Sequence, residues 1–214
     1  MDEDTIVAAP RRGLFGRLAG TLALGLAGFA AAPADAEAAV AAADWPGKLK
    51  GRHRQVVDAV EANGGFPLVF ALTFLVPNPP GSATAAVVLR HGAFPMALGH
   101  AMWAKYKIGE SMKIVDPETK APAVKNPWLN AKPEFLPHDG AGIDQLLSKG
   151  VIFGACNMAL LALSKKFAGN AGATPEEAAT EWAANAVPGI TIVASGTWAV
   201  NRAQEAGCSY CAGG

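Results

Sequence analysis

Residues 150–167 of the chain read GVIFGACNMALLALSKKF. The apolar, partly β-branched run over 151–155 follows a glycine, which predicts a short buried strand. Cys156 comes directly after this run, and residues 157–167 continue with leucines on a helical spacing. The segment therefore predicts a strand that passes through a cysteine into a helix.

On both sides of this segment, strand patterns and helix patterns alternate along the chain. Such alternation indicates an α/β domain with a largely parallel sheet and right-handed crossovers. Ligands of such sheets bind outside the carboxyl ends of the strands. The predicted strands cover 53–60, 84–90, 151–155 and 190–194, and the predicted helices cover 66–76, 94–107, 139–149, 157–167, a stretch capped by Thr174, and 195–206.

Two stretches carry no such pattern. Residues 109–137 are rich in proline and lysine and predict a long loop, which in compact domains is often functional. Trp128, Leu129 and Phe135 within this loop favour burial. Residues 207–214 are predicted to be a short tail.

The amino-acid composition excludes several classes of protein. The 214 residues are 51% hydrophobic and 17% charged, with 18 basic and 18 acidic side chains. Disordered chains show low hydrophobicity and high net charge, so this chain is predicted to fold. Nucleic-acid binders show a basic excess, so nucleic acid is not expected as a partner. Three cysteines are too few for a disulfide scaffold.

The N-terminal residues 1–36 have the parts of an export signal. Arg11 and Arg12 precede an uncharged apolar run over 18–34, and Ala34-Asp35-Ala36 is a small-residue cleavage site. Paired arginines before a weakly hydrophobic run resemble a twin-arginine signal. An uncleaved membrane anchor is the alternative, although the run is short and poor in large apolar residues. We expect cleavage near Ala36, a periplasmic location, a linker over 37–50 and a single domain over 51–214.

Several motifs, in this order and spacing, resemble the DsrE/DsrF-like family. They are the 150–160 segment around Cys156, the 193–200 segment with Ser195 and Gly196, the strand ending at His91-Gly92, and a Gly-x-x-Tyr ending at Tyr210. The resemblance implies a compact three-layer α/β domain with about five strands that forms homo-oligomers. It also implies sulfur or thiol handling, by a sulfurtransferase or a sulfur carrier, with small sulfur species or a thiol protein as partner.

Cys156 is the expected persulfide acceptor of such a protein. A helix N-terminus offers unpaired N–H groups and a partial positive charge, which stabilise the nucleophilic thiolate. Asn157 is expected to donate a hydrogen bond to a bound anion or persulfide, and His91, Ser195 and Gly196 are expected to line the same pocket. A buried cysteine acting as a small hydrophobe is the alternative for Cys156, and a core histidine bonded to backbone is the alternative for His91.

The pair Cys208 and Cys211 has three possible roles. It can be a swinging dithiol that acts as redox partner of Cys156, half of a metal site, or a structural or intermolecular disulfide. No dinucleotide fingerprint, phosphate-binding loop or haem motif is present in the sequence, and His91 and His100 lack the spacing of a zinc helix motif. We therefore expect no cofactor and no metal, and contact with the membrane only through the export signal. A non-catalytic oligomeric binding or assembly protein of the same fold is the alternative function.

Overall fold

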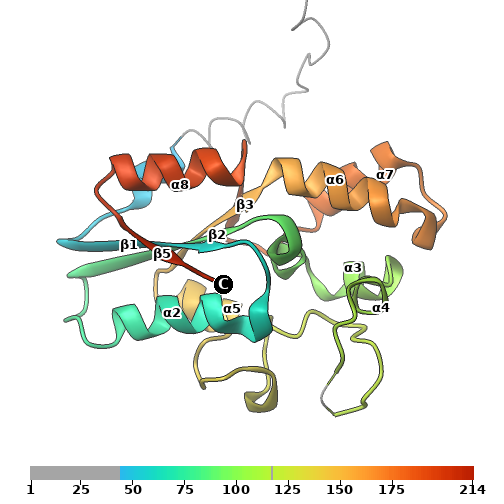
Figure 1. Cartoon of the computed structure of the whole chain (residues 1–214), viewed down its shortest axis with the longest axis horizontal. Helices are drawn as coiled ribbons and strands as arrows, with labels where there is room; N and C mark the ends of the chain where they lie inside the picture. Colours follow the sequence, from blue (N-terminus) through green and yellow to red (C-terminus); the bar gives the residue numbers. More distant parts are fainter. Residues whose placement is uncertain (1–43, 117) are drawn as a thin grey trace, which may run out of the picture.

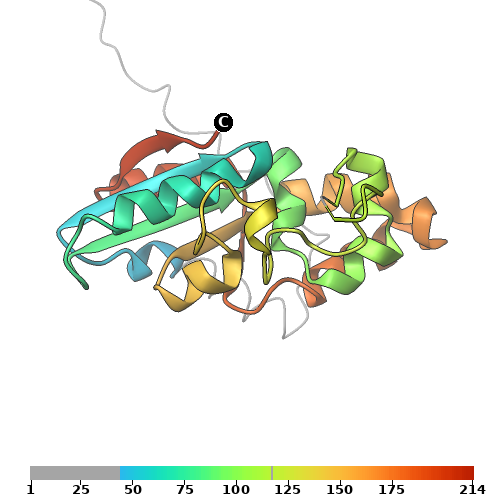
Figure 2. The same cartoon turned by 90° about the horizontal axis from the view of Figure 1, so that it is seen from below.

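The structure is a computed structural model that describes residues 44–116 and 118–214, so the predicted signal and the first half of the predicted linker lie outside the described residues. Within the described part, five strands form one parallel sheet in the order β4-β3-β2-β1-β5. This confirms the predicted α/β class, with helices on both faces of the sheet (Figures 1 and 2). The strands are β1 (His53–Ala59), β2 (Ala83–Leu89), β3 (Ile152–Cys156), β4 (Ile190–Val193) and β5 (Ser209–Ala212).

Two apolar clusters hold the helices against the sheet. One face packs against α2 and α5, and the opposite face packs against α8 and the short 3-10 helix η1, as the lower and upper layers of Figure 1 show. The bounds are η1 (Trp45–Lys48), η2 (Asn63–Gly65), α2 (Phe66–Leu75), α5 (Ile143–Ser148) and α8 (Gly196–Glu205).

A second group of helices lies beyond the carboxyl ends of the strands (Figures 1 and 2). Its core is aromatic: Trp182 stacks on Phe94 and meets Tyr106 edge-on at a ring-centroid distance of 5.4 Å. The group comprises η3 (His91–Ala97), α3 (His100–Lys105), α4 (Ile108–Met112), α6 (Asn157–Phe167), η5 (Ala168–Ala171) and α7 (Pro175–Ala184), with η4 (Pro133–Phe135) in the long loop between α4 and α5.

The single helix predicted over 94–107 is wrong in its first half. Residues 91–97 form a 3-10 helix, and Leu98 and Gly99 then turn extended before α3 begins at His100. Leu98 bridges to Ala186, and the Gly99 N–H donates to the carbonyl of Asn185. This backbone pairing with the segment after α7 takes the place of helical hydrogen bonds.

The predicted linker and the predicted tail both contain ordered elements. Trp45 is fully buried, and its indole N–H donates to the carbonyl of Phe153 at 3.1 Å. Gly154 lets the indole approach the sheet, because a Cβ there would lie 3.1 Å from the ring. At the other end of the domain, residues 209–212 form β5, which pairs with β1. The packed domain therefore begins by Trp45 and includes the tail.

Candidate functional site

Cys156 ends β3 and is the N-cap residue of α6. Its backbone is extended, with φ −70° and ψ 115°, and its Sγ accepts the N–H of Ala159 at 3.4 Å. The cysteine is only 6% exposed. The strand–cysteine–helix arrangement predicted from the sequence is confirmed, and the sulfur lies against an amide of the first helical turn with little contact to solvent.

The neighbours of Cys156 follow from the strand register. Leu89 pairs with Ala155, so Arg90 and Cys156 come next to each other at the carboxyl ends of β2 and β3. On the other side Cys156 pairs with Val193, shortly before α8. The chain leaves β3 into α6, which lies beyond the carboxyl ends of the strands, and leaves β4 into α8, which packs against one face of the sheet. Ligands of parallel sheets bind outside the carboxyl ends of the strands.

Arg90 belongs to a polar network beside Cys156. Its Nε and Nη2 donate to the two carboxylate oxygens of Asp58 at 2.6 and 2.9 Å, and the Tyr210 hydroxyl donates to the same carboxylate at 3.1 Å. The hydrogen bond that Arg90 donates to Asp58 is the main reason that the pKa of Arg90 is raised, and a charge on Cys156 raises it further. The guanidinium therefore keeps its charge next to the cysteine.

The other predicted pocket residues also lie at this edge of the sheet. Ser195 is half-buried and is the N-cap of α8, where its Oγ accepts the Trp198 N–H at 3.2 Å. Gly196 is buried against Arg90, since a Cβ there would lie 2.7 Å from the arginine side chain. Asn157 is half-buried.

His91 follows Arg90 directly and is exposed, so it is not a core histidine. Its φ of +46° lies in the left-handed region, which is uncommon for residues other than glycine but several-fold enriched for histidine. Glycine follows it at position 92, where the carboxylate of Glu61 lies so close that a Cβ would clash. A sharp turn therefore presents the imidazole at the end of β2.

The structure does not bring Cys208 and Cys211 to Cys156. Both are free thiols, and they point to opposite faces of the sheet, Cys208 toward α8 and Cys211 toward α2. Burial raises the pKa of both thiols, although Arg54 partly offsets this for Cys208. β5 also lies three strands away from β3, roughly 14 Å at about 4.8 Å per strand.

Sequence reasoning missed the polar network at the site. Asp58 and Arg90 each interrupt or end an apolar strand, and buried charges are retained only when they are paired. That rule identifies both residues as candidates for pairing. Tyr210 carried no comparable signal, because its bond to Asp58 depends on β5 joining the sheet next to β1.

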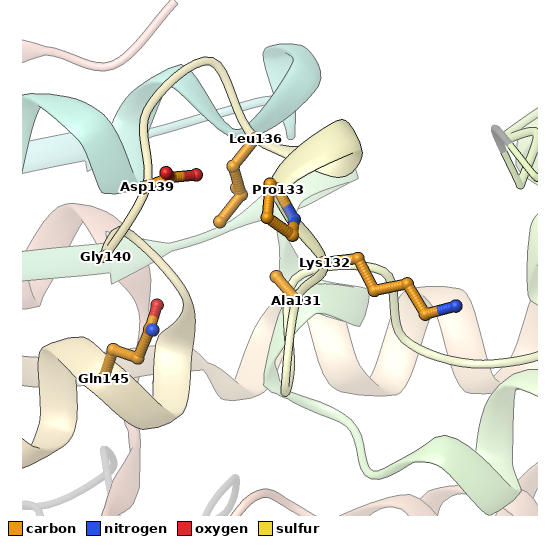
Figure 3. Close-up of a pocket in the computed structure, with 7 residues that line it drawn as sticks. All are labelled: Ala131, Lys132, Pro133, Leu136, Asp139, Gly140 and Gln145. Atoms are coloured by element: carbon orange, nitrogen blue, oxygen red, sulfur yellow. The ribbon is translucent and has the colours of Figure 1, made fainter.

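A separate cavity of about 310 Å³ lies between the loop over 131–140 and the start of α5 (Figure 3). It shares no lining residue with the Cys156 site. In Figure 3 the Leu136 side chain lies between Asp139 and Pro133, while Lys132 extends away from them. Among the described residues, no group of three or more His, Cys, Asp or Glu side chains is placed to hold a metal ion.

The fold and the site define an α/β domain whose parallel sheet carries a buried cysteine, at the start of a helix, on its carboxyl edge. Comparison with known protein families finds no match for the chain, and a comparison with curated proteins finds none either. In the described part of the chain, no helix combines the length and the apolar character needed to cross a membrane.

Proposed function

We propose that this chain is an exported DsrE/DsrF-like protein that handles sulfur or thiols, with Cys156 as the persulfide acceptor. The observation that carries the proposal is the position of this residue. Cys156 ends a parallel strand, and its Sγ accepts an amide N–H at the start of α6. Amide donors and the partial positive charge of a helix N-terminus interact favourably with an anionic sulfur group.

The surroundings of Cys156 suit an anionic sulfur group. The Arg90 guanidinium follows β2 next to it in the strand register, and the N-terminus of α8 rests on Arg90 through Gly196. Arg90 uses two of its five N–H donors on Asp58. Two helix N-termini and one retained positive charge therefore converge on the carboxyl ends of β2, β3 and β4.

The proposed step is a sulfur transfer without net oxidation. The Cys156 thiolate attacks the outer sulfur of a donor persulfide, R–S–SH, and a new S–S bond forms. The original S–S bond of the donor breaks, its electron pair leaves with R–S⁻, and Cys156 becomes Cys–S–SH. The positive charge of Arg90 favours the anionic forms on both sides of this exchange.

Cys208 and Cys211 can act as redox partner of Cys156 only if the structure changes. As redox partner of Cys156 they would have to leave the sheet, because both lie at β5 and face opposite sides of it. A chain with β5 in place passes its sulfur to an external acceptor thiol instead. The sulfur transfer itself needs Cys156 alone.

Exposure of the reduced protein to inorganic polysulfide, followed by mass spectrometry of its peptides, tests the transfer. We expect one added sulfur atom on Cys156 and none in a Cys156→Ser variant. The double variant Cys208→Ser, Cys211→Ser is the matched control and should gain the atom as the unmodified chain does. Added sulfur on Cys211 alone, or alkylation of Cys156 by iodoacetamide no faster than an ordinary thiol near neutral pH, would exclude the proposed role.

A second candidate function is a non-catalytic oligomeric binding or assembly protein. The burial of Cys156 favours it, as do two exposed apolar side chains on the first turns of α6, Met158 at 61% and Leu161 at 45% exposure. Light scattering distinguishes this function: an assembly protein forms oligomers that the double variant Met158→Lys, Leu161→Lys dissociates, and it takes up no sulfur.

The location belongs to the same proposal. The predicted signal over 1–36 lies outside the described residues, and its sequence is the support for export. N-terminal sequencing of the protein recovered from the periplasm is expected to begin near residue 37. Recovery of the full-length chain from the membrane fraction would instead indicate an uncleaved anchor.

A further inference from the structure

His100 opens α3 and accepts a hydrogen bond from a distant part of the chain. The backbone N–H of Asn126 lies 3.2 Å from its Nδ1. Because a backbone N–H can only donate, Nδ1 carries no proton in this arrangement. The imidazole is therefore neutral, with its proton on Nε2.

The side chain of Asn126 also makes hydrogen bonds. It is 2% exposed, and its Nδ2 donates to the carbonyls of Met96 and Leu98, both at 2.8 Å. Its Oδ1 accepts the N–H of Trp128 at 3.0 Å. Every N–H of Asn126 is thus paired, and the backbone N–H is the one that depends on His100.

The segment that Asn126 holds contributes to the core. Trp128 is buried and meets Trp103 of α3 edge-on, at a ring-centroid distance of 5.7 Å. The carbonyl of Trp128 accepts the N–H of Ile143, the first residue of α5. The bond between Asn126 and His100 therefore belongs to a segment that connects α3 to α5.

The charges around His100 disfavour its protonation. Lys125, next to Asn126, is the positive neighbour that acts on the imidazole. The segment over 184–187, which accepts the Gly99 N–H, has no ionisable side chain. The other acidic, basic and histidine side chains on α3 and on η3, α4 and α7 are His91 of η3, Lys105 with its partner Glu181 of α7, Glu176 and Glu177 of α7, and Glu110 of α4.

We propose that His100 is a proton-operated latch: protonation at Nδ1 releases the 123–130 segment from α3 while the sheet stays folded. A proton on Nδ1 would face the N–H of Asn126, so two donors would meet where a bond was. The segment would then lose its contact with the imidazole and expose the buried side chain of Asn126.

The direction of the pH dependence follows from the neutral ring. Burial, and next the charge of Lys125, lower the pKa of His100 below its ordinary value. Since the released state binds the proton more readily, the latch is strongest above the ordinary histidine pKa of about 6.5. It weakens as the pH falls through that value toward the lower pKa of the closed state.

Hydrogen exchange of the full chain tests the latch with a matched variant. His100→Asn places an amide oxygen where Nδ1 accepts, and this group does not titrate. Near pH 7.5 we expect peptides over 123–130 to exchange equally in both proteins. Near pH 5 they should exchange faster in the unmodified chain than in the variant. Peptides of β1, β2 and β3 should show no difference.

A measurement on the unmodified chain keeps the proposal testable if the variant fails to fold. In a nitrogen NMR titration, Nδ1 of His100 should show the shift of an unprotonated ring nitrogen near neutral pH, and the Asn126 amide proton should move with the His100 titration. A proton on Nδ1 near neutral pH, or equal pH dependence of exchange in both proteins, would overturn the latch.

Discussion

Asp58 shows how one residue determines the electrostatics of the site. Its carboxylate is buried and accepts hydrogen bonds from the Arg90 guanidinium and the Tyr210 hydroxyl. Pairing of this kind offsets the cost of desolvating both charges, whereas removal of one partner leaves the other buried alone. The sequence contained the signal for this pair in the charge within β1 and the charge directly after β2, but the third member, Tyr210, depends on β5.

The substitution Asp58→Asn tests this residue-scale view. It keeps the shape and one acceptor oxygen but removes the charge that faces Arg90. We expect the free energy of unfolding to fall by about 2–3 kcal/mol, somewhat below the range for fully buried pairs because the arginine is partly exposed. Urea unfolding followed by circular dichroism measures the change.

The control for this substitution is Tyr210→Phe, which removes only the third hydrogen bond. Its expected cost is about 0.5–1.5 kcal/mol, because Tyr210 is half exposed and the bond is a single one. If Asp58→Asn costs no more than this control, the carboxylate and the guanidinium are not held as a desolvated pair.

At the scale of elements, β5 determines what the tail cysteines can do. Cys208 directly precedes β5 and packs toward α8, whereas Cys211 within β5 packs toward α2, although the sequence places the two close together. A disulfide needs Cβ atoms about 3.5–4.5 Å apart, which this geometry does not provide.

We therefore expect the folded, reduced chain to resist formation of a Cys208–Cys211 disulfide. After treatment of the folded chain with a mild oxidant, thiol titration should still find all three thiols. After the same treatment of the chain unfolded in denaturant, it should find Cys208 and Cys211 oxidised. Time-resolved labelling should reach Cys211 before Cys208, since Cys208 is the more buried. Rapid native oxidation of the pair would show that β5 leaves the sheet readily.

The elements differ in how well local sequence predicts them. The helix over 157–167 was predictable from its leucine spacing, and α7 from the capping box of Thr174 and Glu177. β5 was not, because Ser-Tyr-Cys-Ala has no strand pattern and forms a strand by pairing with β1. The break at Leu98 and Gly99 likewise depends on partners after α7. Local sequence does not predict elements that depend on pairing with distant parts of the chain.

For the whole molecule, the alternation of strands and helices was sufficient to predict the class and the parallel sheet. It also predicted that Cys156 and Ser195 follow strands at the same edge of the sheet, because the carboxyl ends of parallel strands share one edge. The extent of the packed domain was not predictable in the same way. Trp45 lies in an alanine-rich stretch, and its burial depends on the space that Gly154 leaves on β3.

The substitution Trp45→Ala tests whether the predicted linker is part of the domain. Removal of a fully buried tryptophan leaves a cavity against β3, and we expect stability to fall by about 3–5 kcal/mol. A chain beginning at Gly51 should melt at a temperature at least as low as that of the Trp45→Ala variant. Equal melting temperatures of the unmodified chain and the shortened chain would show that the domain folds without this segment.

The position of β5 has a consequence for the order in which the protein is made. β1 emerges from the ribosome early, but its outer edge stays unpaired while the whole intervening chain up to β5 is synthesised. An open strand edge invites pairing with other chains, so the nascent protein is exposed to aggregation until its final strand arrives. A chaperone that covers the edge of β1 during translation would raise the yield more than one that acts after release.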